Sequence, residues 1–359
     1  MPHPLDGLTA FVMDVSYFSG KLEAYLRYKG IPYERVEVGW RRLETEIRAA
    51  TGAAQVPALR FADGTWMTDS TPTIEWLERH APRPAIVPAD PLQAFFVRLL
   101  EDYADEWLWR PALHYRWSFA PDRRLLGERI AREVLYDVPG PVWVKARVVR
   151  RRQQRRYVRN DGVTPETRPH VERVYLDTLA RLDAIFAVQP FLLGERPCLA
   201  DFGFFASMFR HFALDPTPSR LMRERAPQVW AWVARLWAAR ADAVHGAFTA
   251  PGTLPAGWNA LLDDVGTAYL PYLAENAAAW AAGASRFEHA VQGVTYRALR
   301  PHRYRVWCRE RLQHAFDSLP AAVQAPVEER LAAHGCWEPL WRHGRIASGH
   351  PGALEPRGP

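Results

Sequence analysis

Over the first ninety residues, the spacing of apolar residues alternates between the pattern of a β-strand and that of an α-helix. The apolar run 9–13 is short and bounded by turn residues, which predicts a buried strand. Residues 16–28 carry apolar side chains three and four positions apart and stop at Gly30, which predicts a helix. Residues 33–38 predict a second strand. Because one short helix joins the two strands, we expect them to be parallel with a right-handed crossover.

A different pattern follows in the next fifty residues. The apolar runs 58–61 and 66–68 flank an Asp-Gly turn at 63–64, which predicts an antiparallel hairpin. A helix through residue 79 is expected next, with Ser70 as its N-cap. The predicted order is therefore strand, helix, strand, and then strand, strand, helix.

Beyond this unit the pattern becomes helical. Four prolines between residues 82 and 91 predict a linker, and a second break rich in Pro and Gly lies at 251–257. Amphipathic helices are expected between these breaks, and further helices after the second one. The expected later helices are 258–282, 302–317 and 320–334. The predicted units are 8–88, 92–248 and 255–345.

Composition narrows the class of protein. The chain has 359 residues, of which 48% are hydrophobic and 24% charged, as in a globular protein. No apolar run approaches the roughly 20 residues of a membrane span, and the first residues do not resemble a signal peptide. The three cysteines are far apart and odd in number, which predicts a reducing, cytoplasmic location. His334, Cys336 and His343 are too sparse for a zinc site, so we expect no metal.

The net charge of +6 is concentrated in one stretch. Lys145 and seven arginines lie within residues 145–159, and no acidic residue occurs between Asp137 and Asp161. The run is either a solvated helix or loop, or a surface for an anion or nucleic acid. Tyr157 is its only aromatic residue, so the stacking pattern of single-strand binders is missing and we do not expect nucleic acid.

Two motifs lie at turns of the first unit. Residues 55–59, Gln-Val-Pro-Ala-Leu, resemble the V-P-x-L signature of the glutathione S-transferase family, in which the proline is cis. The resemblance implies that the backbone of Val56, before Pro57, pairs with the cysteinyl part of glutathione. Asp69 and Ser70 resemble the family's acidic-Ser pair, which implies that Ser70 binds the γ-glutamyl carboxylate at a helix N-terminus. The alternatives are that Val56–Pro57 is an ordinary strand start and that Ser70 is only a helix cap.

A third motif, residues 16–19, lies at the first strand-to-helix turn. In the family this turn carries Ser or Cys, or a nearby Tyr. The resemblance implies that Ser16 donates a hydrogen bond to the glutathione sulfur and favours the thiolate. Tyr17 and Ser19 are alternative hydroxyls, and Ser16 as a mere N-cap is the structural alternative. Arg41 or Arg42, in the loop after the second predicted strand, is a candidate for binding the glycine carboxylate of glutathione.

Two further resemblances concern the helices. Residues 199–201, Leu-Ala-Asp, are similar to the x-x-A-D box of the family's helical domain, with Cys198 in place of the usual Ser or Thr. We interpret this box as structural. Residues 19–27 are also similar to the N-terminal helix of metaxin and failed-axon-connections proteins, which share the fold and are not generally conjugating enzymes. The resemblance therefore leaves catalysis open.

Together these resemblances imply an α/β thioredoxin-like N-terminal domain, an all-α C-terminal domain of the transferase type and a further helical extension. The implied function is a glutathione-dependent transferase, with glutathione as co-substrate and no metal, whose thiolate attacks a small hydrophobic electrophile. Conjugation, isomerisation and reductive cleavage remain open because all three use the same thiolate. The alternatives are a non-catalytic, metaxin-like scaffold and an anion or RNA binder that uses residues 145–159.

The family also implies a homodimer, in which Asp102 or Asp105 approaches the partner's glutathione amine. The electrophile is expected between the two domains, beside aromatic residues of the first helix after the linker, unless these only pack within the domain. These residues are Tyr103, Trp107, Trp109, Tyr115 and Trp117.

Overall fold

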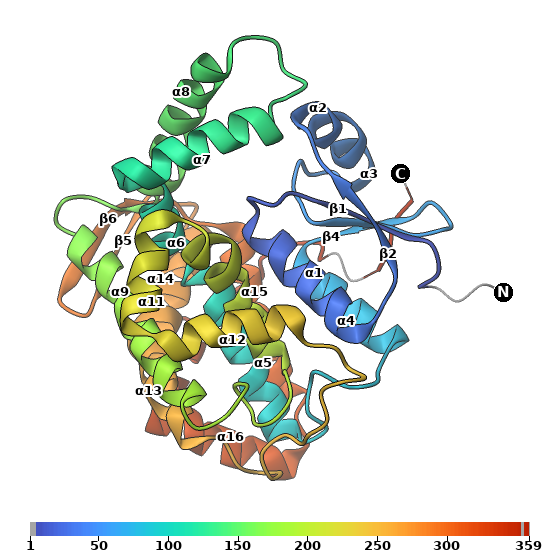
Figure 1. The fold of residues 1–359 in the computed structure, drawn as a ribbon. Helices are drawn as coiled ribbons and strands as arrows, with labels where there is room; N and C mark the ends of the chain where they lie inside the picture. Colours follow the sequence, from blue (N-terminus) through green and yellow to red (C-terminus); the bar gives the residue numbers. More distant parts are fainter. Residues whose placement is uncertain (1–4, 353–354, 359) are drawn as a thin grey trace.

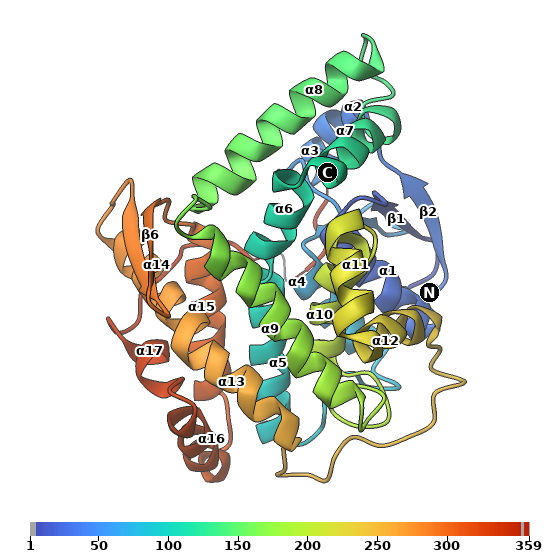
Figure 2. The same cartoon turned by 60° about the vertical axis from the view of Figure 1, so that its left-hand side comes forward.

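The computed structural model describes residues 5–352 and 355–358 (Figure 1). A small sheet with its helices lies beside a larger helical body, and the extension covers the other side of that body (Figures 1 and 2). The elements of the first part are β1 (Leu8–Val12), α1 (Tyr17–Lys29), β2 (Tyr33–Glu37), α2 (Trp40–Arg42), a π-helical turn (Leu43–Ile47), α3 (Arg48–Thr51), β3 (Ala58–Arg60), β4 (Trp66–Thr68) and α4 (Ser70–His80).

The four strands form one sheet in the order β2-β1-β3-β4. β1 pairs with β2 in parallel, with Leu8 opposite Tyr33, whereas β3 is antiparallel to both β1 and β4. β1 is the apolar run LTAFV and is buried throughout. α1 ends at Gly30, whose φ of 66° is the left-handed conformation that glycine adopts without strain. The predicted thioredoxin-like unit is confirmed.

The second part is entirely helical, as predicted. α10 packs between α5 and α1, so it joins the helical body to the first part. The elements are α5 (Pro91–Glu106), α6 (Trp109–Ser118), α7 (Ala120–Glu133), α8 (Val142–Gln153), a π-helical turn (Gln154–Val158), a 3-10 turn (Arg159–Asp161), α9 (Arg168–Phe186), α10 (Leu199–Ser207), a π-helical turn (Met208–Ala213), α11 (Pro216–Arg225) and α12 (Pro227–Ala238).

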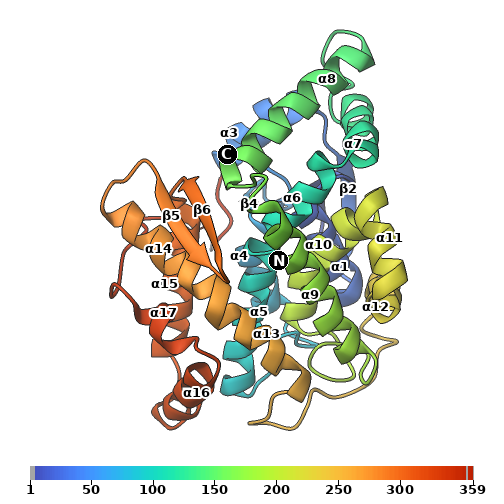
Figure 3. The ribbon, with the colours of Figure 1, turned by 90° about the vertical axis from the view of Figure 1, so that its left-hand side faces the viewer.

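α7 and α8 form a hairpin that stands above the helical body and reaches α2 (Figures 2 and 3). The amide of Trp40 donates to the carbonyl of Val134 at 2.7 Å, and the amide of Arg41 donates to Asp137 at 2.9 Å. The basic run of residues 145–159 begins on α8 and continues through the two short turns after it. Most of its arginines are exposed, in agreement with a solvated helix.

The extension after residue 255 packs along α5 and α9 and does not hang free. It is not entirely helical, however, because β5 and β6 form a hairpin that the sequence analysis missed. Gln292 and Gly293 have φ values of 48° and 79° and form the tight turn between them. The elements are a 3-10 turn (Ala256–Trp258), α13 (Asn259–Asp264), a π-helical turn (Val265–Tyr269), α14 (Leu270–Ala281), β5 (Phe287–Val291), β6 (Val294–Leu299), α15 (Arg303–Asp317), α16 (Ala321–Ala333) and α17 (Trp337–Trp341).

The end of the chain returns to the first part and lies close to β4 (Figure 1). Arg357 and Trp66 exchange two backbone hydrogen bonds of 2.7 and 2.9 Å at the free edge of the sheet. The carboxylate of Glu355 accepts hydrogen bonds from Trp76 and Arg79 of α4. Within residues 5–352 and 355–358, no helix combines the length and the apolar character that a membrane span requires.

Candidate functional site

The turn before β3 has the geometry that the sequence predicts. The Val56–Pro57 peptide bond is cis. Thr68 on β4 donates a hydrogen bond to the Pro57 carbonyl at 3.1 Å, and the Gln55 amide donates to the Thr68 hydroxyl at 3.2 Å. Val56 itself is half-buried, and its backbone N–H and C=O have no hydrogen-bond partner among the described residues. These two groups are therefore available to a peptide-like ligand.

Ser16 lies at the start of α1, after the loop that follows β1. Its Oγ accepts a hydrogen bond from the Ser19 amide at 3.3 Å, so Ser16 is the N-cap of α1. Two buried guanidinium groups of the helical body hold this loop: Arg116 donates to the Val15 carbonyl at 2.7 Å and Arg210 to the Met13 carbonyl at 2.9 Å. The loop that carries Ser16 is therefore anchored to the second part of the chain.

Tyr17 and Ser19 do not fit the role of an alternative hydroxyl. The Tyr17 side chain turns into the helical body, where its hydroxyl donates to the Ala104 carbonyl at 2.8 Å, and only 2% of the residue is exposed. The Ser19 hydroxyl is fully buried and accepts a hydrogen bond from the Met13 amide at 3.3 Å. Both hydroxyls serve the packing of α1, whereas Ser16 remains half-exposed.

The N-cap of α4 is not the residue that the sequence predicts. Asp69, rather than Ser70, is the N-cap of α4 and accepts a hydrogen bond from the Thr71 amide at 3.3 Å. Its φ of 73° is rare for a residue with a side chain and is typical of constrained functional turns. Burial raises the pKa of Asp69 to about 6, although the Tyr304 hydroxyl, Lys21 and Arg311 each act to lower it.

A buried ionic cluster lies directly beneath α4. The Lys21 ammonium of α1 is fully buried and lies 3.0 Å from the Thr71 hydroxyl and 2.5 Å from the Glu101 carboxylate of α5. It also bonds to Asp105. Burial alone would lower the pKa of Lys21, but the Asp105 and Glu101 carboxylates outweigh it and raise that pKa. The cluster therefore ties α1, α4 and α5 together below the predicted site.

The structure overturns the predicted role of Asp102 and Asp105 toward a partner subunit. Asp105 is bonded to Lys21 inside the chain. Asp102 accepts a hydrogen bond of 2.5 Å from the Tyr269 hydroxyl, which the extension supplies. Burial raises the pKa of Asp102 to about 7. Because both carboxylates are covered by their own chain, neither can reach a ligand of another subunit.

Most of the aromatic residues proposed for an electrophile site are packing residues. Tyr103, Trp107, Tyr115 and Trp117 are all buried. Only Trp109, of the five proposed, is half-buried.

Trp109 belongs to a small aromatic wall that includes Phe18, two positions after Ser16. The Trp109 ring stacks on Phe18 with centroids 6.0 Å apart and meets Tyr157 edge-on at 5.8 Å. Phe18 and Tyr157 were not predicted as residues of this wall. Phe18 lies two positions after Ser16 and could have been proposed from that spacing, but Tyr157 reaches the wall only through the fold.

The remaining predicted features have plain structural roles. Arg41 and Arg42 are exposed on α2, and Arg42 pairs with Glu46 at 3.2 Å, so their role toward a glycine carboxylate stays a prediction. Asp201 accepts hydrogen bonds from the amides of Cys198 and Leu192 at 2.9 and 3.0 Å. The x-x-A-D box is therefore a structural cap. In the described part of the chain no three His, Cys, Asp or Glu side chains gather as a metal site would require.

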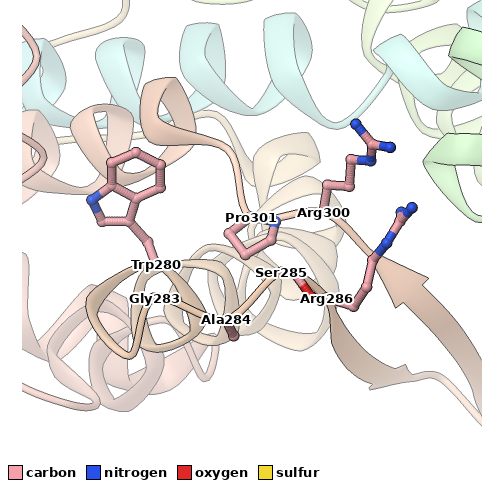
Figure 4. Close-up of a pocket in the computed structure, with 7 residues that line it drawn as sticks. All are labelled: Trp280, Gly283, Ala284, Ser285, Arg286, Arg300 and Pro301. Carbon is pink, nitrogen blue, oxygen red and sulfur yellow. The ribbon is translucent and has the colours of Figure 1, made fainter.

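A hollow of about 600 Å³ lies elsewhere, where α14 leads into β5 and β6 leads into α15 (Figure 4). Its walls are Trp280, residues 283–286, Arg300 and Pro301. Arg286 and Arg300 extend from the side of the hairpin, and both are exposed. None of the predicted site residues lines this hollow, which belongs to the extension.

Comparisons with known proteins agree on one family. The sequence models of the glutathione S-transferase N-terminal and C-terminal domains match residues 15–80 and 160–239. Maleylacetoacetate isomerases of Rattus norvegicus and Mus musculus are each 33% identical over 96 residues. That match spans 24% of this chain and 44%, less than half, of each relative. The similarity of residues 19–27 to metaxin stays a prediction.

Among solved structures, the β-etherase LigF of Sphingobium sp. strain SYK-6 is 24% identical, covers 65% of this chain and 96% of its own, and has a TM-score of 0.47. A glutathione S-transferase of Methylobacterium radiotolerans, in complex with glutathione sulfonate, is 18% identical over 68% of this chain and 97% of its own, with a TM-score of 0.41. The family assignment rests on the two domain matches and the thioredoxin-like and helical parts described above. The chain belongs to the glutathione S-transferase family, with an N-terminal and a C-terminal domain of that family and further helices and a hairpin beyond them.

Proposed function

We propose that the chain binds glutathione at the turn of Val56 and activates its thiol beside Ser16 for reaction with a hydrophobic electrophile. The observation that carries this proposal is the pair of free backbone groups of Val56 before the cis-Pro57 bond. Such groups pair with a bound peptide as an added strand would. Asp69 and the Ser70 amide at the start of α4 then suit the ammonium and the carboxylate of the γ-glutamyl end.

Ser16 is suited to stabilise a thiolate. Because its Oγ accepts the hydrogen bond of the Ser19 amide, its own O–H remains free to donate to a sulfur atom. The N-terminus of α1 adds a favourable field for an anion. A hydrogen bond and a helix N-terminus both favour the charged form of a thiol and so lower its pKa.

The aromatic wall of Phe18, Trp109 and Tyr157 suits an apolar or aromatic electrophile next to that sulfur. Conjugation is the reaction we propose first. Isomerisation is a second candidate, since the rodent relatives that match part of this chain are maleylacetoacetate isomerases. A non-catalytic scaffold would keep the fold without turnover.

Replacing Ser16 with Ala tests the assignment of the hydroxyl. We expect turnover of a general aromatic electrophile to fall about 10- to 100-fold, because a hydrogen bond to a charged group contributes about 1.5–3 kcal/mol. Glutathione affinity should change much less, since most of the proposed contacts lie at Val56 and Asp69. Steady-state kinetics with separate kcat and KM values measure both quantities.

The matched control is Tyr17→Phe, which removes a neighbouring hydroxyl that bonds to Ala104. It should lower thermal stability and leave kcat close to that of the wild type. A fully active Ser16→Ala variant beside an inactive Tyr17→Phe variant would show that the wrong hydroxyl was chosen. A wild-type chain that is retained on immobilised glutathione but turns over no electrophile would favour the scaffold.

A further inference from the structure

The basic run of residues 145–159 carries positive charge that no acidic side chain neutralises. Asp137, the last acidic residue before the run, accepts a hydrogen bond from the Arg41 amide. Asp161, the first acidic residue after it, pairs with Arg110 at 3.2 Å. Among the residues that the structure describes, no carboxylate forms an ion pair with any arginine of the run. Its charge is therefore available to a partner outside the chain.

α8 has an inner face that packs and an outer face that meets solvent. α7 and α8 pack along each other, and Ala146 and Val149 are buried on the inner face. Trp143, Arg147 and Arg151 are spaced four residues apart, so they form one row on the helix, and all three are exposed. Figures 2 and 3 show α8 along the upper edge of the molecule, above the helical body. The outer face is thus a convex ridge.

Apolar side chains are exposed on the same hairpin. Trp143 is 70% exposed and Val148 is 57% exposed on α8, and Leu125 of α7 and Tyr136 of the connecting loop are exposed as well. Half of the large apolar side chains that are exposed in the described part of the chain therefore lie within residues 125–148. The other half are spread over other elements. Apolar side chains that gather on an exposed surface mark an interaction site rather than a merely solvated helix.

Positive charge and exposed apolar side chains together match an anionic lipid surface. Arginine and lysine side chains near such a surface are attracted to its negatively charged headgroups. Trp is favoured at the headgroup level because its ring is apolar and its N–H is polar. Arginine can lay its apolar stem on lipid while its guanidinium stays in water. A convex ridge can also lie on a flat surface.

Other partners use only part of this surface. A nucleic acid would use the positive charge but not the aliphatic side chains, and Tyr157, the aromatic residue of the run, is packed on Trp109. A second copy of the chain in a two-fold dimer would bring the same arginines face to face. A ridge encloses no small anion.

We propose that the outer face of the α7–α8 hairpin docks the chain on an anionic lipid surface, with Trp143 and Val148 at the headgroup level and the arginines of residues 145–159 on the lipid phosphates. The chain would lie on the membrane without crossing it. This docking does not depend on the proposed function. Because Tyr157 at the end of the run belongs to the aromatic wall, docking would bring that wall close to the lipid.

The test is sedimentation of the full-length chain with two kinds of vesicle, pure phosphatidylcholine and a mixture in which about a third of the lipid is phosphatidylglycerol. We expect binding to the anionic vesicles at low salt, and binding at least about tenfold weaker to the neutral vesicles or in about 0.5 M salt. Removing both charges in Arg151→Gln/Arg155→Gln should weaken anionic binding about fivefold for each arginine. Trp143→Ser should weaken it about tenfold. Thermal melts check that each variant is folded.

The matched control combines Arg220→Gln on α11 with Trp230→Ser on α12. Both side chains are exposed, and both lie outside the hairpin, so vesicle binding should not change. Failure of the wild type to bind anionic vesicles at low salt, or wild-type binding by the folded hairpin variants, would overturn the inference. Salt-dependent binding of a polynucleotide that is tighter than vesicle binding and insensitive to Trp143→Ser would overturn it in favour of nucleic acid. None of these outcomes bears on glutathione binding, which the same samples should retain.

Discussion

Replacing Lys21 with Met is expected to destabilise the protein by about 3–5 kcal/mol, because it leaves two buried carboxylates without their cation. The Lys21 ammonium is fully buried and is shared by Glu101, Asp105 and the Thr71 hydroxyl. Because methionine fills a similar volume, the loss of stability reflects the missing charge rather than a cavity. Thermal melting and denaturant unfolding of the variant measure it.

The pH dependence of the stability of the Lys21→Met variant provides a second test. In the wild type burial acts to raise the pKa of Glu101, but Lys21, Arg311 and the Thr71 hydroxyl together outweigh burial and the pKa is lowered. Without Lys21 the burial effect remains, so the folded-state pKa should rise above the unfolded value. A raised carboxyl pKa means that stability is lost as the pH rises through it. The variant should therefore be less impaired at pH 5 than at pH 8.

Two controls separate this effect from ordinary surface electrostatics. Adding Glu101→Gln to Lys21→Met removes one of the stranded charges and should restore part of the stability. Arg297→Met breaks the exposed pair with Glu288 and should change the melting temperature little. A Lys21→Met protein as stable as the wild type at pH 8 would contradict the described cluster.

Ending the chain after residue 255 is expected to leave it largely insoluble or partly unfolded. The extension supplies Tyr269, whose hydroxyl bonds to Asp102, and Arg305, which pairs with Glu106. It also covers Tyr103, whose hydroxyl donates to Asp264. Each large aromatic side chain returned to water costs about 1.5–3 kcal/mol, and each uncompensated buried carboxylate adds to that loss.

Soluble yield, light scattering and binding of a dye for apolar surfaces measure the result of that truncation. The matched control ends after residue 345, which removes the strand contact of Arg357 with Trp66 but keeps α13 to α17. We expect this control to fold, with a modest decrease in melting temperature. If the chain of 255 residues were soluble and melted at the temperature of the full chain, the extension would be an independent appendage.

The sequence was sufficient for the first part of the fold because its signals are local. The Asp-Gly turn predicts the β3–β4 hairpin, and Gly30 marks the end of α1. Both features depend on the conformational preference of a few adjacent residues. Ser16 as the N-cap of α1 is of the same kind. The cis bond of Val56–Pro57 is implied by the resemblance to the family rather than by local preference.

The errors arose where local signals were weak or ambiguous. The turn between β5 and β6 is Gln-Gly, a weaker hairpin signal than Asp-Gly, and it lies among strong helix patterns. Ser70 and Asp69 are both good N-caps, and only the backbone conformation decides that Asp69 takes that position.

The rest of the candidate site depends on contacts between distant segments. Tyr269 donates a hydrogen bond to Asp102 across 167 residues of sequence. Tyr157 reaches Trp109 from a basic run whose pattern predicts only an exposed helix or loop. No local propensity encodes such contacts, so they could be found only from the folded chain.

The central claim, a glutathione site at Val56 and Asp69, is tested most directly by calorimetric titration with S-methylglutathione from pH 5 to pH 8. This ligand has no titratable thiol, so the Asp69 carboxyl is the group whose pKa of about 6 should control binding in this range. The ammonium requires ionised Asp69, so affinity should be constant above pH 7 and fall as the pH drops through 6, up to about tenfold per pH unit. Asp69→Asn should bind more weakly and without that dependence. No saturable binding by the wild type at millimolar ligand at any pH would contradict the account.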